Sequence, residues 1–80
     1  MSQSQLQRLV AMTNQIALNM SANGDPHKVA IQVAQHLDKF WPPPMKDLIT
    51  QQPATIEIGL SSIAQLAVEE LMRTQTAKRP

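Results

Sequence analysis

The stretch His36-Leu37-Asp38-Lys39-Phe40-Trp41-Pro42-Pro43-Pro44-Met45 decides how this chain folds. It holds the single phenylalanine and the single tryptophan of the chain, side by side, directly before three consecutive prolines. Proline lacks an amide hydrogen and its ring clashes with the preceding turn, so a helix has to end here. The sequence therefore predicts a rigid corner that carries two large aromatic side chains.

Two amphipathic helices are predicted before this corner. Apolar side chains recur at helical spacing over residues 6–20 and again over residues 29–41, and each set covers one stripe of a helix. Asn23-Gly24 predicts the end of the first helix, with the glycine in the left-handed conformation. Asp25-Pro26 predicts the N-cap and the first turn of the second helix.

The two aromatic residues are predicted to face different ways. On a helix, Phe40 and Trp41 lie about 100° apart, on different edges of the apolar stripe. We expect Phe40 to pack against the first helix and Trp41 to face outward over the corner, where an exposed tryptophan would be a strong anchor for a partner. His36 lies at the edge of the same stripe, either as a boundary histidine or as a polar contact to that partner.

After the corner the sequence predicts a short helix and then a longer one. Pro44 suits the first turn of the short helix, and residues 56–58 alternate like a strand but have no partner strand, so we expect an extended loop there. Ser61 or Ser62 is expected to cap the last helix, because Ser62 and Gln65 have the spacing of a capping box. The prediction is an all-α fold, a small bundle of three main helices plus one short helical segment, in a single domain over 1–80. Residues 6–73 are expected to be ordered, and 1–5 and 74–80 flexible.

The composition limits the chemistry that this chain can carry. Eighty residues without a cysteine allow one small domain and leave no thiolate for a disulfide or a metal site. His27 and His36 point to opposite sides of one helix, because nine residues turn it through about 900°. Ser61 and Ser62 have no base at a readable spacing. We therefore predict no catalytic, cofactor-binding or metal-binding residue in this chain.

The charge pattern argues against nucleic acid and membranes as partners. The formal net charge is +1 and charged residues are 16% of the chain, whereas nucleic-acid binders present a strongly basic face. A small helical nucleic-acid-binding regulator stays an alternative, since small helical domains often bind DNA. No secretory signal is evident at the start and no apolar run approaches about 18 residues, so we expect a cytoplasmic protein.

Two parts of the sequence resemble a known family. They are Met12-Thr13-Asn14-Gln15-Ile16 in the first helix, and His36 followed by Phe40-Trp41-Pro42-Pro43-Pro44-Met45-Lys46. This pattern resembles the delta subunit of cytoplasmic NAD-dependent, molybdenum-containing formate dehydrogenases. That family typically shows Met-Ala-Asn-Gln-Ile and then His-x-x-x-Phe-Trp-x-Pro-x-Met with a basic residue after it. The resemblance runs from about Leu6 to Leu71, and Lys46 stands where arginine is usual.

The resemblance implies a subunit without chemistry of its own. In such enzymes, formate oxidation and electron transfer to NAD belong to larger subunits, which carry a molybdenum (or tungsten) pterin cofactor, iron–sulfur clusters and FMN. The delta subunit is expected to be a non-catalytic accessory chain that binds no cofactor, docks on the large catalytic subunit and supports assembly or stability of the cofactor-loaded enzyme. A transient chaperone for molybdenum cofactor insertion is a second alternative. The residues expected at the partner interface are Asn14, Gln15, Leu18, His36, Phe40, Trp41, Pro42, Pro44, Met45 and Lys46.

Overall fold

The computed structural model of the chain describes residues 4–52 and 58–78. In chain order, these residues form α1 (Gln5–Met20), the 3-10 turn η1 (Ser21–Asn23), α2 (Pro26–Phe40), α3 (Pro43–Thr50) and α4 (Ser62–Lys78). No strand occurs within the described ranges. The predicted all-α fold, with three main helices and a short one after the proline corner, is confirmed. Residues 56 and 57 of the expected loop lie outside the described residues.

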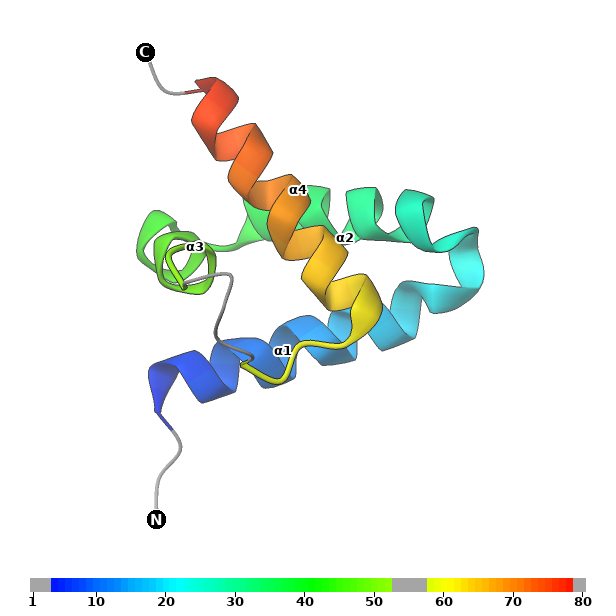
Figure 1. Cartoon of the computed structure of the whole chain (residues 1–80), viewed down its shortest axis with the longest axis horizontal. Coiled ribbons are helices and arrows are strands. Elements are labelled where there is room, and N and C mark those ends of the chain that lie inside the picture. Colours follow the sequence, from blue (N-terminus) through cyan, green and yellow to red (C-terminus); the bar gives the residue numbers. More distant parts are fainter. Residues whose placement is uncertain (1–3, 53–57, 79–80) are drawn as a thin grey trace.

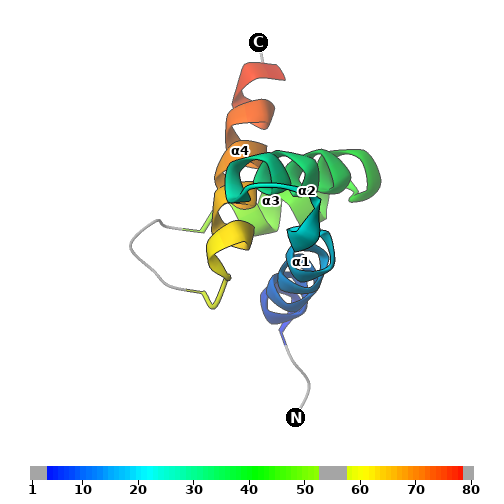
Figure 2. The ribbon, with the colours of Figure 1, turned by 90° about the vertical axis from the view of Figure 1, so that its right-hand side faces the viewer.

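The helices are arranged as a hairpin with a third helix laid across it. α1 and α2 form the hairpin, which η1 closes, and α4 crosses in front of both (Figure 1). The view turned by 90° places α4 on one side and α1 and α2 on the other (Figure 2). α4 has its most extensive contact with α2, whereas α3 packs against α1 and α4. The hairpin therefore has one side that meets α4 and one side that does not.

The core lies where α4 crosses the hairpin, and it is built from small and medium side chains. Alanines occur on both α2 and α4 at this crossing, which lets the two helix axes come close together. Thr13 is fully buried, and its hydroxyl donates a hydrogen bond to the Leu9 carbonyl oxygen at 2.8 Å, so no polar atom is left unsatisfied there. The buried apolar residues are Leu9, Val10, Ala17, Val29, Ala30, Val33, Ala34, Leu37, Trp41, Ile49, Ala64, Ala67, Val68 and Leu71.

The helix starts follow local capping chemistry. Ser4 forms a capping box with Gln7: the Gln7 amide donates to Ser4 Oγ at 3.1 Å, and the Ser4 amide donates to Gln7 Oε1 at 2.9 Å. Asp25 accepts hydrogen bonds from the amides of His27 and Lys28, which confirms its predicted role as the N-cap of α2. These caps satisfy amide groups that have no partner within the helix.

Three predicted details of the helix ends are wrong. Gly24 has φ 154° and ψ −162°, so it is positive in φ but does not adopt the left-handed helical conformation. Ser61 Oγ, not Ser62, accepts the Ala64 amide at 3.3 Å, because α4 begins at Ser62 itself. α4 also continues to Lys78, five residues beyond the predicted end of order at residue 73. Within the described chain, no helix combines the length and the apolar character needed to cross a membrane.

Candidate partner interface

The proline corner is a short, tight connection between α2 and α3. α2 ends at Phe40, and Trp41 has extended backbone angles, φ −89° and ψ 135°. Pro42 is the N-cap of α3, with prolines in the first turn, where a missing amide hydrogen has no cost. The Pro42 carbonyl oxygen accepts the amides of Met45 and Lys46 at 3.0 and 3.3 Å. Proline thus ends α2 and starts α3 within two residues.

The two aromatic side chains take the opposite positions from those predicted. Trp41 is 7% exposed and belongs to the core, whereas Phe40 is 63% exposed. The prediction placed Trp41 by helical rotation, but its extended backbone takes it out of the helix and turns the indole inward. Phe40 keeps its helical position, and none of the described elements covers it there. The exposed aromatic of the corner is therefore Phe40, and Trp41 as an outward-facing anchor is wrong.

Phe40 lies between two neighbours from its own helix. The ring centroid of His36 is 4.8 Å from that of Phe40, with a 45° tilt. The Lys39 Nζ lies 5.5 Å from the centroid of the Phe40 ring, within the range of a cation–π interaction. His36 is half-buried, as expected at the edge of the apolar stripe. The corner therefore presents an exposed aromatic ring next to a cation.

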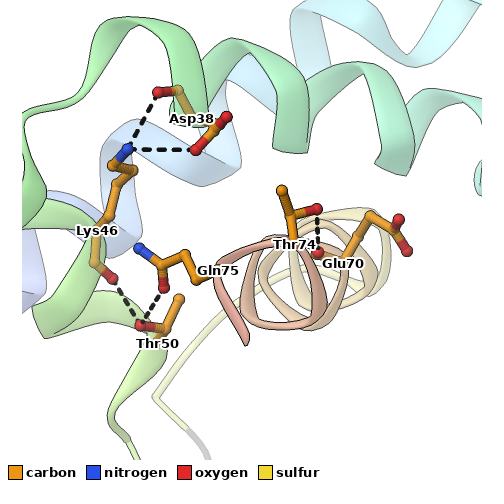
Figure 3. Close-up of polar contacts among 6 residues, drawn as sticks. All are labelled: Asp38, Lys46, Thr50, Glu70, Thr74 and Gln75. Carbon is orange, nitrogen blue, oxygen red and sulfur yellow. Dashed lines mark hydrogen bonds and ion pairs between the residues drawn. The ribbon is translucent and has the colours of Figure 1, made fainter. Parts of the chain in front are cut away.

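Lys46 holds α3 to the end of α2 (Figure 3). Its Nζ donates to the Asp38 carbonyl oxygen at 3.1 Å and to Asp38 Oδ1 at 3.2 Å. A cation at this place satisfies a carbonyl of the last turn and interacts favourably with the negative end of the helix dipole. The Lys46 side chain is only 15% exposed. Its observed contacts are within the chain, although the sequence predicted it at the partner interface.

A polar seam joins α3 to α4 (Figure 3). The Thr50 hydroxyl donates to the Lys46 carbonyl oxygen at 2.8 Å and lies 3.2 Å from Gln75 Oε1. On α4, the Thr74 hydroxyl donates to the Glu70 carbonyl oxygen at 3.0 Å. The sequence analysis did not find this seam, because residues 74–80 were expected to be flexible.

Asn14 is also engaged within the chain. Its Nδ2 donates to the Gly59 carbonyl oxygen at 2.9 Å, and its Oδ1 accepts the Ser61 amide at 2.8 Å. One side-chain amide thus pairs with the backbone on both sides of residue 60 and fixes the approach to α4. Gln15 is exposed and donates to Asn19 Oδ1 at 3.1 Å. Neighbouring Leu18 is 67% exposed.

Leu18 lines an open, mostly apolar groove between α1 and the start of α4. The groove has a volume of about 470 Å³, and Ser21 of η1 and Ile63 of α4 also line it. It therefore lies at the hinge end of the hairpin. The proline corner lies at the other end of α2, about 22 Å away by the rise of a 15-residue helix.

The predicted interface residues do not form one surface. At the corner, Phe40 and His36 are in contact, Pro42 and Pro44 are exposed, and Met45 is half-buried against the core. Asn14 and Leu18 belong to the groove, Gln15 is on the exposed part of α1, and Trp41 and Lys46 face inward. The sequence analysis missed Lys39 and Met12, of which Met12 is 43% exposed. The i, i+4 spacing of His36 and Phe40 was a signal for the ring contact.

The side chains of this chain do not fit a metal centre. Among the described residues, no three histidine, aspartate or glutamate side chains gather in a group that could hold a metal ion. The sequence has no cysteine, so it offers no thiolate for an iron–sulfur cluster.

Comparison with known proteins agrees with the resemblance seen in the sequence. A protein-family model described as NADH-dependent formate dehydrogenase delta subunit FdsD matches residues 8–68. No significant match was found among curated proteins or among solved structures. The matched range covers more than half of the chain and includes both Asn14 and the whole proline corner. The chain belongs to the NADH-dependent formate dehydrogenase delta subunit family.

Proposed function

We propose that this chain is a non-catalytic accessory subunit of an NAD-dependent formate dehydrogenase. It docks on the large catalytic subunit and supports assembly or stability of the cofactor-loaded enzyme in the cytoplasm. The observation that carries the proposal is the family match over residues 8–68, which spans most of the folded chain. The structure adds a small helical domain with exposed apolar side chains, a combination that suits a chain which works in contact with another protein.

The polar groups of the chain support a role outside the chemistry. Lys46 is engaged with Asp38, Asn14 with the backbone at 59–61, and Ser61 with the start of α4. Each has a structural task, and none is set beside a base or a second ligand as a catalytic group needs to be. We therefore expect the molybdenum or tungsten pterin cofactor, the iron–sulfur clusters and the FMN on the larger subunits.

The size of the domain supports a lasting association. A core of this kind supplies roughly 3–5 kcal/mol without disulfides or metals. Five large apolar side chains, those of Met12, Leu18, Ile31, Phe40 and Met72, are exposed in the described part of the chain. A partner that covers some of them and binds only the folded form stabilises this domain by mass action.

The experiment that tests this proposal follows the chain through purification of the enzyme. A tagged copy is expressed with the formate dehydrogenase subunits, and the complex is separated by gel filtration. We expect the chain to co-elute with active, cofactor-loaded enzyme in a fixed ratio. Enrichment on the cofactor-free form and absence from active enzyme would instead favour the transient chaperone. Co-elution with nucleic acid and not with enzyme would favour the regulator.

A further inference from the structure

The side of the hairpin that meets α4 carries most of the acidic residues. Asp38 of α2 and Glu70 of α4 line one crevice between these helices, and Asp47 of α3 lines another against α4. Glu69 belongs to α4 itself. Of the acidic residues that the structure describes, only Asp25 is elsewhere: it caps the start of α2, about 22 Å along the helix from Phe40.

Two exposed apolar residues lie on the opposite side. Asn14 of α1 binds the segment before α4, and Ile31 of α2 lines the crevice with α4, so these two residues mark the sides that meet α4. At about 100° per residue, Met12 is about 160° from Asn14, and Phe40 is about 180° from Ile31. α4 lies on one side of the hairpin in both views (Figures 1 and 2). Met12 and Phe40 therefore face away from α4.

The same side carries cations. The Lys39 Nζ lies 5.5 Å from the centroid of the Phe40 ring, and the His36 ring lies against its other neighbour position at 4.8 Å. Arg8 is exposed and precedes Met12 by four residues, so the two share one face of α1. The two ion pairs recorded among the described side chains involve other residues. We call Arg8, Met12, His36, Lys39 and Phe40 the Phe40 patch.

We propose that the Phe40 patch is the docking surface of this chain and that its partner is an acidic, partly apolar surface of the large catalytic subunit. The proposal rests on the proposed function and adds to it the face and the chemistry of the contact. Phe40 supplies a large apolar ring held on the last turn of α2, next to the rigid proline corner, so little side-chain freedom is lost on docking. Lys39 and Arg8 complement carboxylates around an apolar centre.

A protein partner fits the patch better than nucleic acid does. Nucleic-acid affinity comes chiefly from many cations set along phosphates, whereas this patch has two permanent cations on either side of exposed apolar side chains. The acidic residues gathered against α4 make the opposite side a poor match for an acidic partner. Charge therefore orients the chain, with the Phe40 patch toward the partner and α4 away from it.

The test measures binding of the full-length chain to formate dehydrogenase purified without it. Phe40→Ala and Lys39→Glu remove the apolar and the cationic part of the patch. Leu18→Ala and Arg73→Glu are matched controls, because they make similar changes at exposed residues of the groove and of α4. Circular dichroism melts verify that each variant is folded before its affinity is measured.

We expect the two patch variants to bind at least about tenfold more weakly and the two controls to bind within about twofold of wild type. Raising the salt from about 0.05 M to about 0.3 M should weaken wild-type binding, and Lys39→Glu should reduce this salt dependence. Wild-type affinity in both patch variants, with loss of binding in Leu18→Ala, would overturn the Phe40 patch and leave the proposed function standing. Failure of the wild-type chain to bind the enzyme would overturn the proposed function itself. Tight nucleic-acid binding at physiological salt, or a dimer of this chain that Phe40→Ala disrupts, would overturn the choice of partner.

Discussion

Replacing the two adjacent aromatic residues one at a time separates the core from the surface of this domain. Trp41 is 7% exposed and packs in the core, whereas Phe40 is 63% exposed. Trp41→Ala therefore removes a buried side chain, and Phe40→Ala removes one that is mostly in water. Each is the control for the other, since they are neighbours in the sequence and both lose an aromatic ring.

The expected difference in stability is several kcal/mol. A buried tryptophan covers about 150–250 Å², and at about 25 cal/mol per Å² its truncation costs roughly 4 kcal/mol or more, in line with about 3–5 kcal/mol for large-to-small changes in cores. An 80-residue domain of this kind has only about 4–12 kcal/mol in total. Phe40 is about one-third buried, so its truncation should cost about 0.5–1 kcal/mol.

Thermal and urea unfolding followed by circular dichroism measures both values. We expect Trp41→Ala to lose most of its cooperative transition at room temperature. Phe40→Ala should melt within about 8 °C of wild type, since 1 kcal/mol shifts Tm by about 4–8 °C in a domain of this size. In Phe40→Ala, Trp41 is still the single tryptophan, and its fluorescence should report a buried indole. A Trp41→Ala variant as stable as wild type, or a Phe40→Ala variant that unfolds, would refute the assignment of Trp41 to the core.

Three further changes test contacts that position the elements. Asn14→Ala should destabilise the domain by about 1–2 kcal/mol in urea unfolding, because it leaves two backbone groups of the segment 59–61 without their partner; no change would mean that water replaces the amide fully. Lys46→Met should cost about 1–2 kcal/mol through loss of the contacts with Asp38, while Lys46→Arg should keep most of the stability; equal stability of all three would contradict the role of the cation. Gly59→Ala should cost about 1 kcal/mol or more because φ is 94°, and since an added Cβ would be 3.8 Å from Val10 Cγ1, an ordinary contact, a larger side chain should cost little beyond this.

Sequence patterns predicted the elements of this fold well, because the signals were local. Asp25 caps α2 and proline ends it, as the chemistry of these residues requires. Periodicity placed the buried sides of α1 and α2 correctly, since apolar side chains at helical spacing must share a face. The end of α4 was missed because residues 74–78 are polar, yet Thr74 and Gln75 make polar contacts on its surface.

The interface residues were harder to predict, because exposure depends on tertiary packing. Rotation on a helix indicates which way Phe40 points but not whether a neighbour reaches its level, and it fails for Trp41, whose backbone is extended. Asn14 and Lys46 looked available in sequence, but their polar atoms bind groups 45 residues and 8 residues away within the chain. Such pairings follow from the packed arrangement of the elements and leave no local pattern.

The most direct test of the proposed function is native mass spectrometry of active formate dehydrogenase isolated through a tag on this chain. We predict that the enzyme complex carries the 8.9 kDa chain in a fixed stoichiometry and releases it when the complex is dissociated. Loss of the chain from the complex should leave all metal and flavin with the larger subunits. Active enzyme of full mass without the chain, or a tagged chain that brings down no formate dehydrogenase subunit, would contradict the account.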